Sequence, residues 1–178
     1  SYFSNVECEI SNREFHTITG TYLNKRITVL STGIGCDNID IVLNELDALA
    51  NIDFSTREEH ETPRSLTIVR IGTCGGLQPY TPSGTFIASQ KSIGFDGPQG
   101  RELRLPLADP HLNEKIVTFE HEGLRVTNFE MEGSAIAGLA KLMGHRALTC
   151  CMVIANRRAK NVKLNYNNTI DVLIKKVL

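Results

Sequence analysis

Short runs of β-branched residues alternate with a helical apolar pattern in the first half of the chain, and this alternation constrains the fold most. Ile27 to Ser31 (ITVLS) and Leu66 to Ile71 (LTIVRI) are predicted to be buried strands. A helix with Asp37 as its N-cap is predicted between them, from apolar residues spaced by three and four: Ile39, Val42, Leu43, Leu46, Leu49 and Ala50. This order predicts a right-handed parallel βαβ unit.

The second half continues the mixture of strands and helices. Strands are predicted at Thr85 to Ser89 and at Ala147 to Ala155. Helices are predicted at about 111–119, 134–143 and 169–178, and Gly144 suits the position after a helix end. The chain is therefore predicted to have an α/β fold.

Length and charge exclude several classes of protein. The chain has 178 residues, which suits one domain with a core of its own. A net charge of -1 gives no electrostatic reason to expect nucleic acid or an anionic membrane as a partner. No apolar run reaches the roughly 20 residues of a membrane span, and residues 1–10 do not have the pattern of a signal peptide.

The five cysteines are expected to be free thiols. They form no CxxC pair, and Cys150 and Cys151 are adjacent, so neither a disulfide framework nor a structural zinc site is predicted. The histidines show no metal-ligand spacing either, and no metal is predicted. All five cysteines are expected to be small buried residues in a reducing compartment, the cytoplasm.

Arg70 lies inside an otherwise apolar strand and is followed by Gly72 to Gly76 in the segment RIGTCGG. A buried arginine has to be paired, and ligands of open α/β sheets bind beyond the carboxyl ends of strands. We expect a glycine turn whose N–H groups bind an anion together with Thr73 and Arg70. The alternative is a plain glycine turn with Arg70 in a structural ion pair.

Glu130 and Glu132 flank Met131 directly before a predicted helix. Residues two apart in an extended segment point the same way, and carboxylates suit a vicinal diol such as a ribose. Phe129 and Met131 would add apolar contact. The alternative is ordinary capping, because helix N-termini favour negative charge.

Three further motifs are weaker on their own. Thr32 to Gly35 (TGIG) has Asn38 where a dinucleotide loop has its third glycine, so a tight turn is favoured over an NAD site. Gln99 and Arg101 in GPQGR present an amide and a guanidinium that can bind two acceptors on a planar ring. The Arg13–Glu14 pair in SNREF would alone be a surface pair.

In combination these motifs are specific. SNREF, STGIG, RIGTCGG, GPQGR, NFEMEG and VIANR occur in this order over nearly the whole chain. With them the chain resembles the nucleoside phosphorylase superfamily, and most closely its uridine phosphorylase branch. The resemblance implies one domain over residues 1–178, with a mixed central sheet flanked by helices on both faces. It also implies a pentosyltransferase of pyrimidine salvage, which converts uridine and phosphate reversibly to uracil and ribose 1-phosphate.

The resemblance also implies roles for individual residues. Arg70 and Thr73 match phosphate ligands of the family, and Arg13 matches an arginine lent to the phosphate site of a neighbouring subunit. Glu132 matches the carboxylate that holds the ribose hydroxyls. Arg101 matches one of the pair that binds the uracil ring, so that Arg70, Arg101 and Glu132 would be catalytic.

The remaining nucleoside-site positions surround these residues. They are Cys74, Gly75, Gln99, Glu130, Met131 and Arg157, with Gln99 as the partner of Arg101 at the uracil ring.

The resemblance implies an oligomer without a cofactor. An arginine shared between subunits requires at least a homodimer, and a hexamer built as a trimer of dimers is the alternative. Phosphate is a co-substrate. Some relatives hold a monovalent cation between subunits near the positions of Glu14, Ile34 and Asn38, and Asn38 replaces a serine there.

Two departures from the family pattern concern length. Relatives begin with a strand that ends in a GDPxR-type phosphate loop, which is not found before Ser1. Relatives also have a long stretch where Ile93 to Asp96 runs directly into GPQGR. We therefore expect a longer protein, from which an N-terminal segment and a stretch near Asp96–Gly97 are missing.

Other functions remain open at this point. A purine nucleoside phosphorylase usually carries an aspartate near the position of Asn156, so the asparagine argues against that branch. A hydrolytic nucleosidase lacks arginines at the positions of Arg13 and Arg70, so the presence of both argues against a hydrolase. A non-catalytic nucleoside-binding relative is favoured if the first phosphate loop is truly missing. A dinucleotide-binding domain is the most distant alternative.

Overall fold

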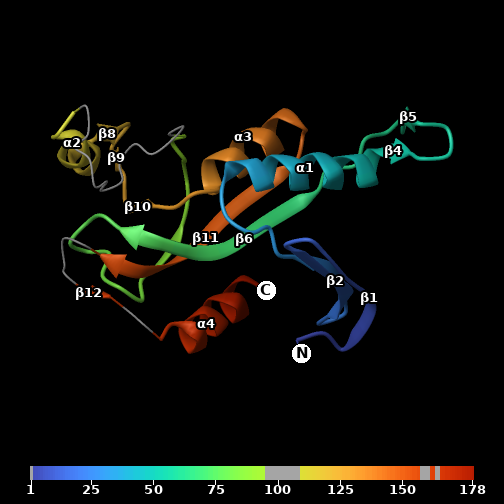
Figure 1. The fold of residues 1–178 in the computed structure, drawn as a ribbon, viewed down its shortest axis with the longest axis horizontal. Coiled ribbons are helices and arrows are strands. Elements are labelled where there is room, and N and C mark those ends of the chain that lie inside the picture. Colours follow the sequence, from blue (N-terminus) through green and yellow to red (C-terminus); the bar gives the residue numbers. More distant parts are fainter. Residues whose placement is uncertain (1, 95–108, 157–160, 163–164) are drawn as a thin grey trace. The chain divides into compact units, whose positions relative to one another are not determined.

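The computed structural model describes residues 2–94, 109–156, 161–162 and 165–178 (Figure 1). The chain forms two compact units, residues 1–63 and 64–178. The expectation of one domain over the whole chain stays a prediction. No helix in the described part of the chain is both long and apolar enough to cross a membrane.

The first unit contains a three-stranded antiparallel sheet in the order β1-β2-β3. Its strands are β1 (Asn5–Asn12), β2 (Phe15–Tyr22) and β3 (Lys25–Leu30). β3 pairs antiparallel with β2, and the predicted parallel βαβ unit stays a prediction, because β3 and β6 belong to different units. Strands β1 and β2 were not foreseen, and most residues of β3 are exposed instead of buried.

Helix α1 (Cys36–Asn51) confirms the helix predicted from the apolar spacing. Its N-cap is Gly35, with φ 99°, and Asp37 lies in the first turn instead of capping it. Ile39, Val42 and Leu43 are buried, whereas Leu49 is exposed. A small hairpin of β4 (Ile52–Asp53) and β5 (Glu58–Glu59) follows the helix.

The second unit is built on a five-stranded mixed sheet, which confirms the α/β fold. Its centre is the parallel pair of β6 (Thr67–Gly76) and β11 (Arg146–Asn156). The short strands β7 (Phe86–Ala88) and β12 (Asn161–Val162) pair antiparallel with β11, and β10 (Asn128–Phe129) pairs antiparallel with β6.

Helices α3 (Gly133–Leu142) and α4 (Asn167–Val177) lie on opposite sides of this sheet (Figure 1). Alternation along β11 explains the two layers. Cys151 and Val153 pack with Cys74 of β6 in one buried cluster, and Cys150 and Met152 pack with Leu173 of α4 in the other. Gly144, with φ 75°, follows the end of α3 as predicted.

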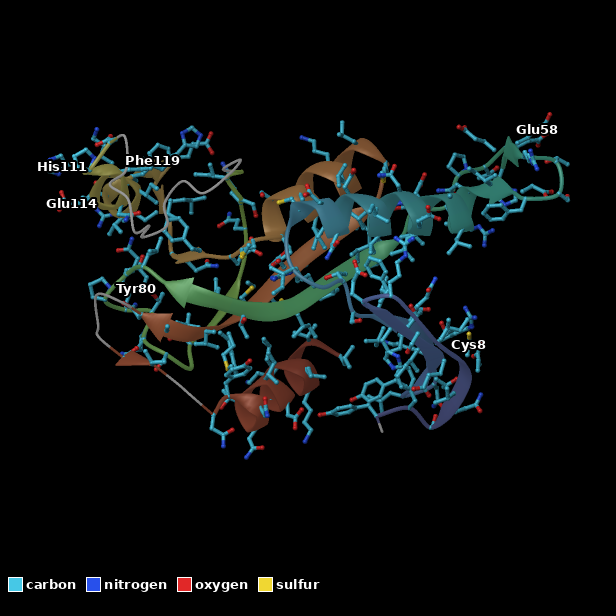
Figure 2. All side chains as sticks on the ribbon, in the orientation of Figure 1. Cys8, Glu58, Tyr80, His111, Glu114 and Phe119 are labelled. Carbon is cyan, nitrogen blue, oxygen red and sulfur yellow. The ribbon has the colours of Figure 1, made fainter. Side chains whose placement is uncertain are left out.

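The predicted short helix after Pro110 is α2 (Leu112–Thr118). The N–H of His111 donates to the Asp109 carboxylate, and the His111 ring meets Glu114 one turn later (Figure 2). A hairpin of β8 (Glu120–His121) and β9 (Leu124–Arg125) joins this helix to β10.

The glycine-rich segment after Arg70 is strand and not turn. Strand β6 continues to Gly76, with Gly72 paired to Cys151 of β11 and Gly75 paired to Phe129 of β10. The predicted anion-binding turn of backbone N–H groups is therefore wrong. β6 continues because it has strand neighbours on both edges, which the local sequence does not reveal.

All five cysteines are free, as predicted, but they are not all buried. Cys74, Cys150 and Cys151 are buried in the second unit. Cys8, on β1, and Cys36, at the start of α1, are exposed (Cys8 in Figure 2).

This difference predicts the result of a thiol titration. In the folded protein a water-soluble thiol reagent should modify Cys8 and Cys36 quickly, and it should modify all five cysteines in denaturant. Mass spectrometry of the modified peptides checks the assignment. Fast modification of Cys150 or Cys151 in the native protein would contradict the packing of β11.

Candidate active site

Arg70 is the centre of the most strongly charged buried group in the described second unit. It lies in the middle of β6, opposite Thr149 of β11, and its side chain is only 14% exposed. A guanidinium at that depth has lost most of its water, so it must be compensated by nearby acceptors.

Three side chains compensate the buried positive charge of Arg70. Its Nη2 forms an ion pair with Oε2 of Glu132. Its Nη1 lies 3.2 Å from Oε2 of Glu130 and donates to the Cys151 sulfur at 3.1 Å. Glu130 and Glu132 thus point the same way, as their spacing predicts.

These partners keep the guanidinium charged. Burial opposes the charge, but the attraction of Cys151, Glu132 and Glu130 outweighs burial and raises the pKa of Arg70 above its ordinary value. Arg70 therefore supplies a fixed positive charge at any pH at which the protein is folded.

Glu130 also caps α3, so the capping interpretation of this segment is confirmed, and a role in binding a sugar stays a prediction. Its carboxylate accepts the N–H of Glu132 at 3.0 Å and the N–H of Gly133 at 2.8 Å. These N–H groups belong to the first turn of the helix and have no intrahelical acceptor. The negative charge at this end also suits the helix dipole.

Gly72 makes room for the guanidinium. A Cβ at this position would lie 2.8 Å from Cζ, Nη1 and Nη2 of Arg70. The side chain of Arg70 therefore lies flat over the backbone of its own strand, and only glycine permits this approach.

Cys74 and Cys151 form a buried thiol pair beside Arg70. The hydrogen bond between the two thiols, with burial, raises the pKa of Cys74 far above its ordinary value. The same hydrogen bond, assisted by the nearby Arg70 charge, lowers the pKa of Cys151. The Cys151 sulfur also accepts a hydrogen bond from Arg70.

The other site residues predicted in Arg70–Gly76 and Asn128–Gly133 do not gather around Arg70. Thr73 stands opposite Met152, and strand alternation directs its side chain away from the face that carries Arg70. Gly75 lies in the ladder opposite Phe129, and Met131 is 40% exposed. The structure therefore brings together Arg70, Cys74, Glu130 and Glu132, but it does not bring Thr73 to them.

Arg13 belongs to the first unit. It occupies the turn between β1 and β2, with a left-handed φ of 53°. In the same unit the positions linked to a cation are close in space, because a Cβ on Gly33 would lie 2.6 Å from Nδ2 of Asn38 and 3.8 Å from Cγ of Glu14. Asn38 also donates to the backbone oxygen of Ile34 at 3.4 Å.

Three predicted residues, Gln99, Arg101 and Arg157, lie outside the described residues. The same holds for Phe95 and for the Asp96–Gly97 joint.

Asn156 has a role that sequence reasoning missed. It is 1% exposed at the end of β11, and its Nδ2 donates to the backbone oxygens of Gln78 and Thr81, each at 2.8 Å. Gln78 in turn donates to the oxygens of Val117 and Val126. The only signal in the sequence was a polar residue ending an apolar strand. Asn156 thus ties the end of β11 to the segment that follows β6.

Comparison with known proteins agrees with the fold. Residues 1–128 match the model of the Phosphorylase superfamily, and this match covers most of the chain. The chain therefore belongs to the phosphorylase superfamily. A nucleoside phosphorylase of Trypanosoma brucei, described as showing uridine phosphorylase activity, superposes with a TM-score of 0.77 over 98% of this chain and 85% of its own, at 21% identity.

Curated relatives come from two branches. A uridine phosphorylase of Thermococcus kodakarensis is 27% identical over 82% of this chain and 64% of its own length. A DeoD-type purine nucleoside phosphorylase of Alkaliphilus metalliredigens is 33% identical over 44% of this chain and 28% of its own. The chain spans less than two thirds of the length of the curated relatives that it matches.

The packing of Arg70 predicts the effect of Gly72→Ala. The added Cβ would displace the guanidinium from Glu130 and Glu132, and we expect a loss of about 1–3 kcal/mol in the free energy of unfolding. Urea denaturation measures the loss. Gly138→Ala is the control, because no atom lies within 4 Å of a Cβ at that position of α3, and it should be neutral or stabilising. Equal stability of the two variants would contradict the placement of Arg70.

Proposed function

We propose that the protein is a uridine phosphorylase, a pentosyltransferase that converts uridine and phosphate reversibly to uracil and ribose 1-phosphate. The observation that carries the proposal is the group of Arg70, Glu130 and Glu132 where β6, β10 and the start of α3 meet. It combines a fixed cation with carboxylates, which phosphate and a sugar diol require respectively.

Arg70 retains donors for phosphate. A guanidinium has five N–H groups, and the hydrogen bonds to Cys151 and Glu132 and the ion pair with Glu130 use at most three of them. The remaining donors suit the proposed contact with a phosphate oxygen. Thr73 stays a prediction from the sequence as a second ligand, because strand alternation directs its side chain to the other face of β6.

The charge of this group supports an oligomer. One guanidinium stands against two carboxylates, a net charge of 1 − 2 = −1, which repels a phosphate dianion. We therefore propose that Arg13 of a second subunit supplies further positive charge. The active form would then be a homodimer or a hexamer made of dimers.

The reaction follows from these positions. A phosphate oxygen bonds to C1′ of the ribose while the bond from C1′ to N1 of uracil breaks, and the electron pair leaves with the base. The bound phosphate stabilises the positive charge that grows on the sugar. Glu132 orients the ribose hydroxyls, with Met131 against the sugar, and neither acts as an acid or base.

The leaving base requires donors of its own. Gln99 and Arg101 are proposed to donate to the oxygens of the uracil anion, and Arg157 to stand on the same side. The anion then takes a proton from water.

Cys74 and Gly75 would complete the nucleoside site. No cofactor is needed. A monovalent cation is proposed near Glu14, Ile34 and Asn38. The free thiols support the cytoplasm as the location.

A purine nucleoside phosphorylase is the second candidate, because several relatives of that type match a short part of the chain. The side chain of Asn156 does not favour it. Its amide donates to two backbone oxygens inside the protein, so it cannot also serve a purine ring with those donors.

The decisive experiment is turnover of uridine and of inosine by the full-length protein, each with and without phosphate. Phosphate-dependent release of uracil without turnover of inosine is expected. Turnover of inosine would assign the purine branch, and turnover without phosphate would mean a hydrolase. A protein that binds uridine but converts neither nucleoside would be a non-catalytic relative.

Single variants should separate the two halves of the site. Arg101→Ala should lower kcat/KM for uridine about 100-fold, because a donor to the leaving base is lost, with little change in phosphate binding. Arg70→Ala should weaken the use of phosphate. Steady-state kinetics with each substrate varied in turn checks both, and unchanged constants in both variants would refute the assignment.

A further inference from the structure

Glu130 makes more contacts than a sugar ligand would need. Its Oε2 lies 3.2 Å from Nη1 of Arg70, and the same carboxylate accepts the N–H groups of Glu132 and Gly133. A carboxylate has about four lone-pair sites, and these contacts occupy most of them. Its side chain is 13% exposed, so little of it faces solvent or a ligand.

The backbone beside Glu130 leaves room for its carboxylate. A Cβ on Gly133 would lie 2.6 Å from Oε1 of Glu130 and 3.2 Å from Oγ1 of Thr149. Gly133 therefore leaves room for Glu130 in the same way that Gly72 leaves room for Arg70. The two glycines let a carboxylate and a guanidinium approach the backbone and each other.

The contacts of Glu130 involve two neighbouring residues of the proposed site, Arg70 and Glu132. One goes to the guanidinium of Arg70, the proposed phosphate ligand. The other fixes the backbone of Glu132, whose side chain pairs with the same arginine. Glu130 thus links Arg70 to the first N–H groups of α3, and Glu132 links the same arginine to the start of the helix through its side chain.

We propose that Glu130 is a positioning residue, which fixes Arg70 and the backbone of Glu132 and makes no contact with the nucleoside. This inference rests on the proposed function and changes the role of Glu130 within it. Phosphate affinity then depends on Glu130 through Arg70, although Glu130 is itself an anion. Any effect of Glu130 on the sugar is passed on through Glu132.

Glu130→Asp tests the proposal, because it keeps the charge and withdraws the carboxylate by one methylene. The shortened side chain cannot hold Arg70 and both N–H groups at once. We expect the amides of Glu132 and Gly133 to exchange hydrogen at least about 10-fold faster, since local opening governs their protection. Inorganic phosphate should bind several-fold more weakly by calorimetry.

A matched control uses an exposed ion pair. Glu120→Asp shortens a carboxylate that lies 3.0 Å from Nε of Arg125, outside the site, and neither readout should change. If Glu130→Asp does not fold, Gly133→Ala displaces the same carboxylate without altering it, and the same two changes are expected.

The outcomes separate this inference from the proposed function. Faster amide exchange together with weaker phosphate binding supports the positioning role. Unchanged exchange, or unchanged phosphate affinity with a raised KM for uridine alone, would overturn it and make Glu130 a sugar ligand. If the native protein neither binds phosphate nor turns over uridine, the proposed function fails, and the amide exchange alone then decides whether Glu130 holds α3.

Discussion

The buried charge of Arg70 is the constraint on which the second unit depends. Removing a guanidinium from water costs several kcal/mol, and only close, well-oriented acceptors offset that cost. Here two carboxylates and a sulfur surround it. They come from the connection between β10 and α3, from the start of α3 and from β11, so the ion pairs can form only when these elements have reached their places. The charge therefore makes the packing of the unit specific.

The parallel strands β6 and β11 position this charged group. Alternation along β11 sends Cys151 and Val153 to one layer and Cys150 and Met152 to the other. The first layer carries the charged group, while the second packs on α4 and is apolar. The charged group and the apolar packing on α4 thus lie on opposite faces of the same two strands.

Local patterns in the sequence predicted which segments form helices and strands better than they predicted which strands pair. The helix spacing of Ile39, Val42 and Leu43, the glycine after α3 and the charged pair before it were all found in the structure. The pairing of β3 with β2 was missed because β2 was not predicted to be a strand, although only two residues separate the two strands. Gly72 was taken for part of a turn because the strands that pair with β6 are distant from it in sequence. Gln99 and Arg101, which the uridine assignment needs, were predicted from motifs alone and lie outside the described residues.

The buried amide of Asn156 limits how this chain can evolve. Its Nδ2 stands between two backbone oxygens, and an aspartate there would place a carboxylate oxygen against them. A lineage could acquire an acid at this position only after the segment from Gln78 to Thr81 had changed its conformation. The two changes would have to occur together or in that order, so the substitution is closed to a single mutational step.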